Sequence, residues 1–176
     1  MGITIKRARR AVQLCTDLAA YAEYDRAVAA LDEAQKRDGQ TIKPSDATRI
    51  AATLVQDIED RMQAATLTFE VEAHRRDAWE AFEAAHPARE GDEVDGRFGI
   101  DLSALDEMIA ASIVAVTDHD GESVEFAAGD WSELADEISQ AQWQDFALAV
   151  LAVNRGVKAA PFSQSASRTT RASATA

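Results

Sequence analysis

The chain has 176 residues, a length that fits one ordinary domain or two small helical halves. Hydrophobic residues make up 47% of it, which excludes a wholly disordered protein, and the scarcity of aromatic residues (6%), glycine and proline favours closely packed helices over a large β-sandwich. Residues 17–154 hold 10 basic and 31 acidic residues, a net charge of −21, and so acidic a body repels phosphate and argues against nucleic-acid binding.

The first segment, residues 1–16, is a basic arm without acidic residues that ends in a possible short strand. Val12 and Leu14 alternate there with polar neighbours, as in a strand with one buried face. Cys15 is the only cysteine of the chain, which excludes an internal disulfide and a thiolate metal site. We expect Cys15 to pack as a small apolar side chain.

Neither a signal peptide nor a membrane span is expected. The basic arm is not followed by the apolar run that a signal peptide needs. The longest apolar runs, Met108–Val116 and Phe146–Val153, are far shorter than the about 20 residues of a membrane-spanning helix. We therefore expect a protein that works in the cytoplasm and has no membrane partner.

Residues 17–63 are expected to form an antiparallel helical hairpin. Asp17 caps the first helix, and Ser45 caps the second after a turn marked by Gly39 and Pro44. Stripes at helical spacing run along both helices: Leu18, Tyr21, Ala22, Asp25, Val28 and Leu31 on the first, and Ile50, Leu54, Ile58 and Met62 on the second. These stripes either close on each other or receive another chain.

Residues 64–158 are expected to hold a strand and a helical bundle. Leu67, Phe69 and Val71 alternate with polar residues, which is the pattern of a half-buried strand. If Val12–Leu14 is also a strand, the two can pair at the base of the hairpin. That pairing would leave the hairpin projecting from the body.

Four helices are predicted after this strand. The first covers about Arg76–Ala85, and the second runs from a cap at Asp101 or Ser103 to about Val114. The third covers about Asp130–Ile138, and the fourth, which follows a cap at Ser139, covers Gln140–Asn154. A polar loop, His86–Gly99, separates the first two. The turn signal Asp118–Gly121 closes either a small β-hairpin between Val114–Val116 and Val124–Phe126 or a loop between helices.

Residues 159–176 are rich in Ser, Thr, Ala and Arg and lack periodicity, so a disordered C-terminal tail is expected. The expected fold is therefore mainly α, with an N-terminal antiparallel helical hairpin, one or two short β-strands, a C-terminal helical bundle and that tail.

Large apolar side chains are candidates either for the core or for contacts with a partner. A small domain needs its aromatic residues inside, and we assign Phe69, Trp131, Trp143, Phe146 and Val150 to the core. Exposed aromatic and aliphatic side chains instead anchor partners. The partner-binding candidates are Tyr21, Val28, Leu31, Leu54, Ile58, Trp79 and Phe82.

The sequence shows no motif of catalysis or metal binding. Asp118–Glu125 has its glycine and glutamate at the wrong positions for a calcium loop of the EF-hand type. His74, His86 and His119 lie in separate segments without the paired spacing of a zinc site. Phosphate loops, nucleophile elbows and dinucleotide fingerprints are missing as well. We therefore expect no cofactor and no metal, and an enzyme is the least favoured function.

A series of short motifs runs through the chain between about Leu14 and Asn154. In order they are Trp79-x-x-Phe82-x-x-x-His86-Pro87-x-Arg89, Ile109-Ala-Ala-Ser112, Asp130-Trp131 with Leu134, Trp143-x-x-Phe146 and Val153-Asn154. In this order the chain resembles the tail assembly chaperones of long-tailed phages that infect actinobacteria. It departs from their pattern in two ways. One proline follows His86, where many members of the family carry two, and an acidic insert, Glu90–Asp95, comes next.

The resemblance implies a function in phage tail assembly. Chaperones of this family bind the long, aggregation-prone tape-measure protein in the host cytoplasm and help recruit tail-tube subunits around it. They are absent from the finished virion, and self-association and a longer frameshifted form are open possibilities. The alternatives are a permanent virion part, such as a head–tail connector or a tail-completion subunit, and, third, a small enzyme.

Overall fold

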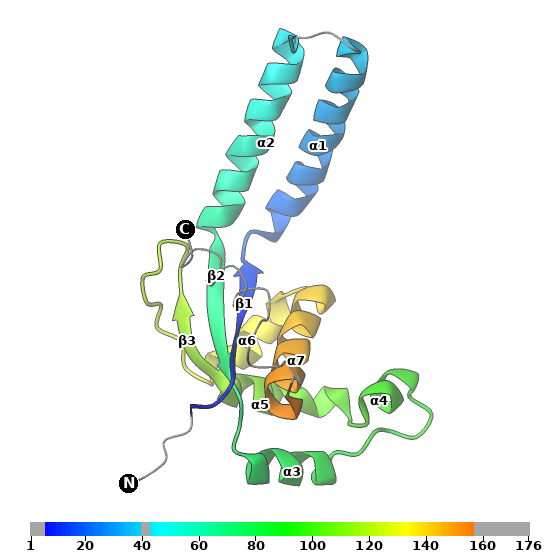
Figure 1. Ribbon diagram of the computed structural model, residues 1–176, viewed down its shortest axis with the longest axis vertical. Coiled ribbons are helices and arrows are strands. Elements are labelled where there is room, and N and C mark those ends of the chain that lie inside the picture. Colours follow the sequence, from blue (N-terminus) through cyan, green and yellow to red (C-terminus); the bar gives the residue numbers. More distant parts are fainter. Residues whose placement is uncertain (1–5, 40–42, 157–176) are drawn as a thin grey trace, which may run out of the picture.

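The computed structural model describes residues 6–39 and 43–156, which form a mainly helical fold with a small antiparallel sheet (Figure 1). The strands are β1 (Arg9–Cys15), β2 (Thr66–Glu72) and β3 (Ile113–Thr117). The helices are α1 (Leu18–Asp38), α2 (Asp46–Ala64), α3 (Arg76–Ala85), α4 (Glu93–Phe98), the 3₁₀ helix η1 (Leu102–Ala104), α5 (Leu105–Ser112), α6 (Asp130–Glu137) and α7 (Gln140–Arg155). The predicted mainly α class is confirmed, and the predicted tail, 159–176, lies outside the described residues.

The sheet has the strand order β1–β2–β3 with antiparallel pairs throughout. β1 and β2 pair along their whole length, with Val12 opposite Phe69 and Leu14 opposite Leu67. The alternation of apolar residues in both segments places these side chains on the buried face. One or two strands are therefore too few, because β3 adds a third along the other side of β2.

β3 forms where the sequence predicts the end of a helix. α5 ends at Ser112, earlier than the expected end at about Val114. The residues that follow, Ile113–Thr117, are mostly β-branched, and Val116 lies buried opposite Phe69. Burial against the sheet thus outweighs continuation of the helix. Beyond β3, the second arm of the suggested β-hairpin makes a bridge and no strand.

The hairpin of α1 and α2 projects from the end of the sheet (Figure 1). Asp17 and Ser45 cap the two helices, each accepting a hydrogen bond from a backbone N–H of the first turn. The buried line of α1 consists of alanines seven residues apart, Ala20, Ala27 and Ala34. Small side chains at that spacing let two helices approach closely. The inner face of α1 is therefore this alanine line. Of the stripe predicted for α1, Val28 and Leu31 pack partly against the seam between the helices, whereas Leu18 and Tyr21 are exposed.

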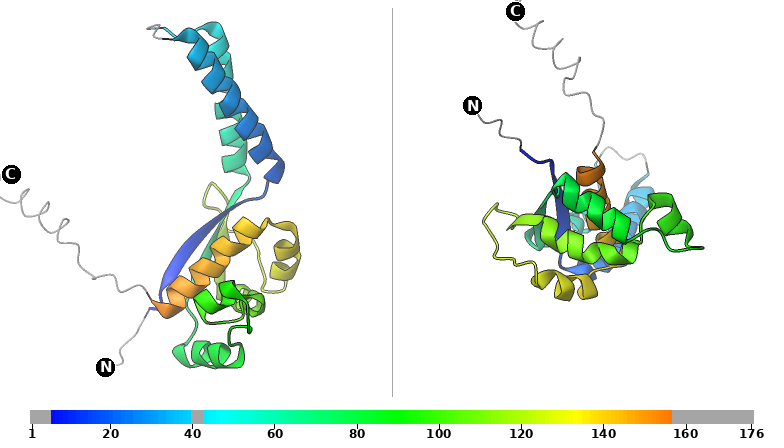
Figure 2. Two further views of the ribbon diagram at one scale, coloured as in Figure 1. Left: turned by 90° about the vertical axis from the view of Figure 1, so that its right-hand side faces the viewer. Right: turned by 90° about the horizontal axis from the view of Figure 1, so that it is seen from below.

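The core of the body lies between the sheet and the helices that cover one of its faces (Figure 2). α7 packs across β1 and β2, and its Phe146 meets Phe69 edge to face at 5.1 Å between ring centroids. Trp131 of α6 also packs against Phe146, at 4.9 Å between ring centroids. A capping box at Ser139 starts α7, and Gly156, with φ of +76°, follows its last residue.

The expected polar loop, His86–Gly99, contains a helix, α4, that the sequence pattern does not predict. Asp92 caps it by accepting from the N–H groups of Val94 and Asp95. Gly99, with φ of +75°, ends it in the left-handed conformation that glycine adopts without strain. Asp101 likewise caps η1 through the N–H of Ser103, so the expected helix four begins as a 3₁₀ turn.

Candidate partner-binding groove

An open groove of about 780 Å³ lies between α4 on one side and α7 on the other. Apolar side chains line it together with charged, hydroxyl and amide side chains. The apolar lining is Val94, Phe98, Leu102, Ala135, Ile138, Trp143, Ala147, Leu148 and Leu151, and the polar lining is Arg89, Asp92, Asp95, Arg97, Ser103, Asp106, Gln140 and Gln144. A concave surface of this composition suits an amphipathic ligand.

The wall on the α4 side is a closed loop. The N–H of Asp101 donates to the carbonyl of His86 at 3.0 Å, and Pro87 makes an antiparallel bridge with Ile100. The chain between these points is thus tied at its base, where Pro87 has already ended α3 by restricting His86. The His86-Pro87-x-Arg89 segment therefore fixes the stem from which α4 presents its side chains.

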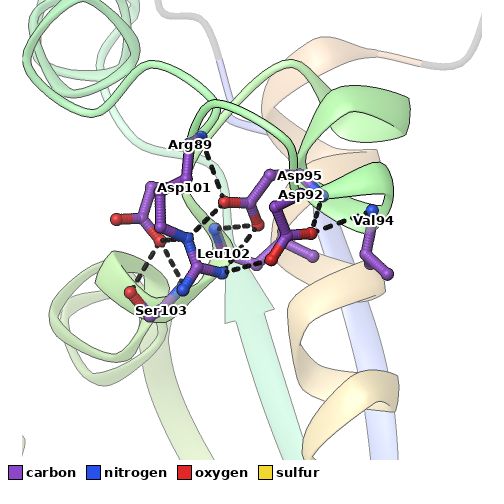
Figure 3. Close-up of polar contacts among 7 residues, drawn as sticks. All are labelled: Arg89, Asp92, Val94, Asp95, Asp101, Leu102 and Ser103. Carbon is purple, nitrogen blue, oxygen red and sulfur yellow. Dashed lines mark hydrogen bonds and ion pairs between the residues drawn. The ribbon is translucent and has the colours of Figure 1, made fainter.

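Arg89 and Asp95 hold this loop together from inside (Figure 3). The Asp95 side chain is fully buried, and its Oδ2 accepts from Arg89 Nε at 2.6 Å while its Oδ1 accepts from Arg89 Nη2 at 3.2 Å. The N–H groups of Arg89 and Leu102 also donate to this carboxylate, at 3.3 and 3.1 Å. A buried carboxylate with a bidentate guanidinium and two amides is fully satisfied.

These contacts set the charge state of the pair. Hydrogen bonding from Arg89 lowers the pKa of Asp95 to about 2, against the opposing effect of burial. The same contact with Asp95 raises the pKa of Arg89 above its ordinary value, with further support from Asp101 and Asp92. Three aspartates converge on the Arg89 guanidinium: Asp92 and Asp95 from the acidic insert, and Asp101 from the start of η1.

The opposite wall is built around tryptophan. Trp143 of α7 is half-buried, lines the groove and packs against the core. Its indole N–H donates to Asp106 of α5 at 2.8 Å. This bond directs one edge of the indole toward α5, while the apolar part of the Trp143 ring remains part of the groove wall. Trp143 is thus a wall of the groove as much as a core residue.

Two of the residues that line the groove are exposed aliphatic side chains. Val94 on α4 is 55% exposed, and Leu148 on α7 is 48% exposed. Both line the hollow between the two helices. Isolated exposed aliphatic residues are common, but these two line one groove together with other apolar side chains, which makes the groove a surface that a partner can cover.

The structure places the predicted partner-binding residues in different environments. Tyr21 and Leu54 are exposed, at 45% and 49%. Val28, Leu31 and Phe82 are half-buried. Ile58 and Trp79 are buried, at 5% each, so these two cannot serve as contacts on the surface described. Of the predicted core, Phe69, Trp131, Phe146 and Val150 are buried and Trp143 is half-buried.

Tyr21 and Leu54 do not share one surface of the hairpin. Tyr24 donates to Glu59 on one side of the α1–α2 seam, and Arg61 pairs with Glu23. At 100° per residue, Glu23 and Tyr24 lie on either side of the buried alanine line of α1. Tyr21 falls on the Tyr24 side and Leu54 on the Arg61 side. The predicted hairpin stripe is therefore divided.

Val94, Asp95, Asp106 and Leu148 also line the groove and are not among the residues predicted from the sequence. Only Asp95 had a usable signal, because Asp92-x-x-Asp95 is a favourable helix start with an arginine nearby. Leu148 looks like one more apolar residue of α7, and only the contacts show that it faces α4.

Across residues 6–39 and 43–156, no three histidine, cysteine or acidic side chains converge in a way that could hold a metal ion. No helix in the same ranges is both long and apolar enough to cross a membrane. Comparison with protein-family models, curated proteins and solved structures found no match to this chain.

Proposed function

We propose that this protein is a phage tail assembly chaperone that binds the tape-measure protein in the host cytoplasm and helps recruit tail-tube subunits. The ordered series of motifs described above supports the proposal through its resemblance to the chaperones of actinobacteriophages. The acidic body also suits a factor that must stay unbound except to its partner. The protein acts during assembly and leaves before the virion is complete.

The observation that carries the proposal is the groove between α4 and α7. Its apolar lining and the exposed Val94 and Leu148 suit the helix-in-groove mode of recognition, in which an amphipathic helix places its apolar face in a hydrophobic groove. A tape-measure protein is a long helix with such faces. A single groove of this size gives modest affinity, which allows tail-tube subunits to displace the chaperone.

The test is co-expression of the protein with the tape-measure protein of its phage. The wild-type protein is expected to keep the tape-measure protein soluble and to co-purify with it. Leu148→Asp places a charge on the lining of the groove and is expected to reduce co-purification at least tenfold. Leu18→Asp is the matched control, because Leu18 is similarly exposed (41%) but belongs to α1 and does not line the groove. Equal loss in both variants would contradict groove binding.

A second measurement separates the chaperone from a permanent connector. Mass spectrometry of purified virions is expected to lack this protein, and a clean gene deletion is expected to leave filled heads without tails. The protein at a fixed stoichiometry in virions, or normal tails after the deletion, would overturn the chaperone proposal.

A further inference from the structure

The sheet has an open edge along β1. The N–H of Ala73 donates to the carbonyl of Ala8 at 2.9 Å, and the antiparallel ladder continues from there. In such a ladder alternate residues direct both backbone groups at the neighbouring strand. Even-numbered residues of β1 therefore face β2, and the N–H and C=O groups of Arg9, Ala11 and Gln13 point away from the sheet.

Nothing else in the described ranges bonds to these outward groups of Arg9, Ala11 and Gln13. The next outward carbonyl, that of Cys15, is taken by the side-chain amide of Gln142 at 3.0 Å, so the edge is closed at that end only. Ala11 and Gln13 are exposed. Figure 2 shows β1 at the border of the sheet, with α7 across one face.

The opposite edge of the sheet is covered at Val116–Asp118. The N–H of Val124 donates to the carbonyl of Val116 at 2.9 Å, and the N–H of Asp118 donates to the carbonyl of Glu122 at 3.0 Å. The segment after β3 thus folds back along it. An exposed edge strand is a template for another strand. Of the two edge strands, β1 has the longer row of backbone groups without a hydrogen bond to a described residue.

The charge around β1 is opposite to that of the body. Arg7 and Arg9 pair with Glu72, and Arg9 also pairs with Glu70, so these two arginines are neutralised within the sheet. Lys6 and Arg10 are exposed and form no ion pair with any described residue. Residues 6 and 10 are an even number apart, so in an extended chain their side chains lie on the same face.

From the outward amides and these two unpaired cations, we infer that β1 takes up an extended, acidic segment of a partner protein as a fourth strand of the sheet. Backbone hydrogen bonds to Arg9, Ala11 and Gln13 hold the segment. Acidic side chains at alternate positions of the segment lie beside Lys6 and Arg10. This surface is separate from the groove, and its test does not depend on the tape-measure protein.

Charge favours an acidic segment over a second copy of β1. In an antiparallel pair of two β1 strands centred on Ala11, Arg10 lies opposite Val12 of the other copy. The two Arg10 side chains then become diagonal neighbours, about 7–8 Å apart. Like charges at that distance repel, and no described acidic residue neutralises either of them. An acidic strand in the same place removes the repulsion.

The probe is a labelled seven-residue peptide in which glutamate and threonine alternate, with a lysine–threonine peptide as its control. Fluorescence anisotropy with the full chain is expected to show binding of the acidic peptide at least tenfold tighter than that of the basic one, weakening as salt rises. Amide hydrogen exchange is expected to slow at Ala11 and Gln13 when the acidic peptide is added.

Ala11→Pro removes only an outward N–H, and proline is tolerated on an edge strand, so the variant is expected to keep its melting temperature and lose binding at least tenfold. Ala11→Val keeps the N–H and is expected to bind like the wild type. Arg10→Gln is expected to weaken binding and flatten its salt dependence. Unchanged binding by Ala11→Pro, equal binding of both peptides, no binding of either, or a dimer that Ala11→Pro dissolves would each overturn the inference.

Discussion

Trp131 and Trp143 donate their indole N–H groups to the same oxygen, Oδ1 of Asp106, at 3.0 and 2.8 Å. The three residues belong to α6, α7 and α5, so a single carboxylate joins three helices beside the groove. Trp131 is 2% exposed, whereas Trp143 is half-buried. The same atom therefore anchors a core residue and a residue of the groove wall.

Asp106→Ala is expected to destabilise the protein by about 1–3 kcal/mol, because two indole donors lose a charged acceptor and the one on Trp131 is buried. Urea denaturation followed by tryptophan fluorescence measures this change. Glu107→Ala is the control: Glu107 is the next residue on α5, is exposed and has no ion pair or hydrogen bond through its side chain to a described residue. A cost of Asp106→Ala no larger than that of Glu107→Ala would show that the shared acceptor is unimportant.

Asp95→Asn is expected to lower the melting temperature in a pH-dependent way. The pKa of Asp95 is lowered to about 2 in the folded protein, mainly by Arg89, while an unfolded aspartate titrates near about 4. The carboxylate therefore contributes stability that is complete above about pH 4 and is lost as the pH falls toward 2. The difference in melting temperature between wild type and variant should be constant near neutral pH and shrink over that window.

Glu93→Gln supplies the comparison for this pH series, since Glu93 lies on the same helix but is exposed. Its melting temperature should follow that of the wild type at every pH. A difference between wild type and Asp95→Asn that does not change between pH 7 and pH 2 would mean that Arg89 does not stabilise the ionised form of Asp95.

Trp79→Phe is expected to cost less than Trp131→Phe. Both tryptophans are buried, but the indole nitrogen of Trp79 has no acceptor among the described residues, whereas that of Trp131 bonds to Asp106. Phenylalanine removes an unpaired donor in the first case and a made hydrogen bond in the second, a contrast of about 1–3 kcal/mol. Chemical denaturation of the two variants side by side measures it, and equal costs would show that the Trp79 nitrogen is paired in solution.

Leu54→Asp and Ile58→Asp, one turn apart on α2, are expected to behave oppositely. Leu54 is 49% exposed, so a charge there should change the melting temperature little, while Ile58, at 5%, packs in the α1–α2 seam and should lose several degrees when charged. Circular dichroism and thermal melts decide this. Strong destabilisation by Leu54→Asp would place that residue inside the hairpin.

Local signals in the sequence predict the mainly helical class and several of the helix starts. Asp17, Ser45 and Ser139 cap their helices as expected, because a cap depends on a few adjacent residues. The inner face of α1 is not evident from the sequence. Its buried residues, Ala20, Ala27 and Ala34, are only weakly hydrophobic, whereas the larger Leu18 and Tyr21 suggest a stripe that turns out to be exposed.

The groove depends on contacts between distant segments. α4 is short and polar, and it becomes part of a wall only because Asp95 is buried against Arg89 and Leu102. Leu148 looks like a core residue until α4 is placed opposite it. Such partners have no fixed spacing in the sequence, so periodicity cannot reveal them.

The hairpin also has a consequence for folding. β1 leads directly into α1, and α2 leads directly into β2, so Cys15 and Thr66 are paired although about 50 residues separate them. Closing so long a loop without structure is slow and entropically costly. Once α1 and α2 have packed, the adjoining ends of β1 and β2 already lie side by side. The two strands can then pair without closing a long unstructured loop. We therefore expect the hairpin helices to acquire hydrogen-exchange protection before β1 and β2, and pulse labelling during refolding would show the reverse order if the sheet nucleates first.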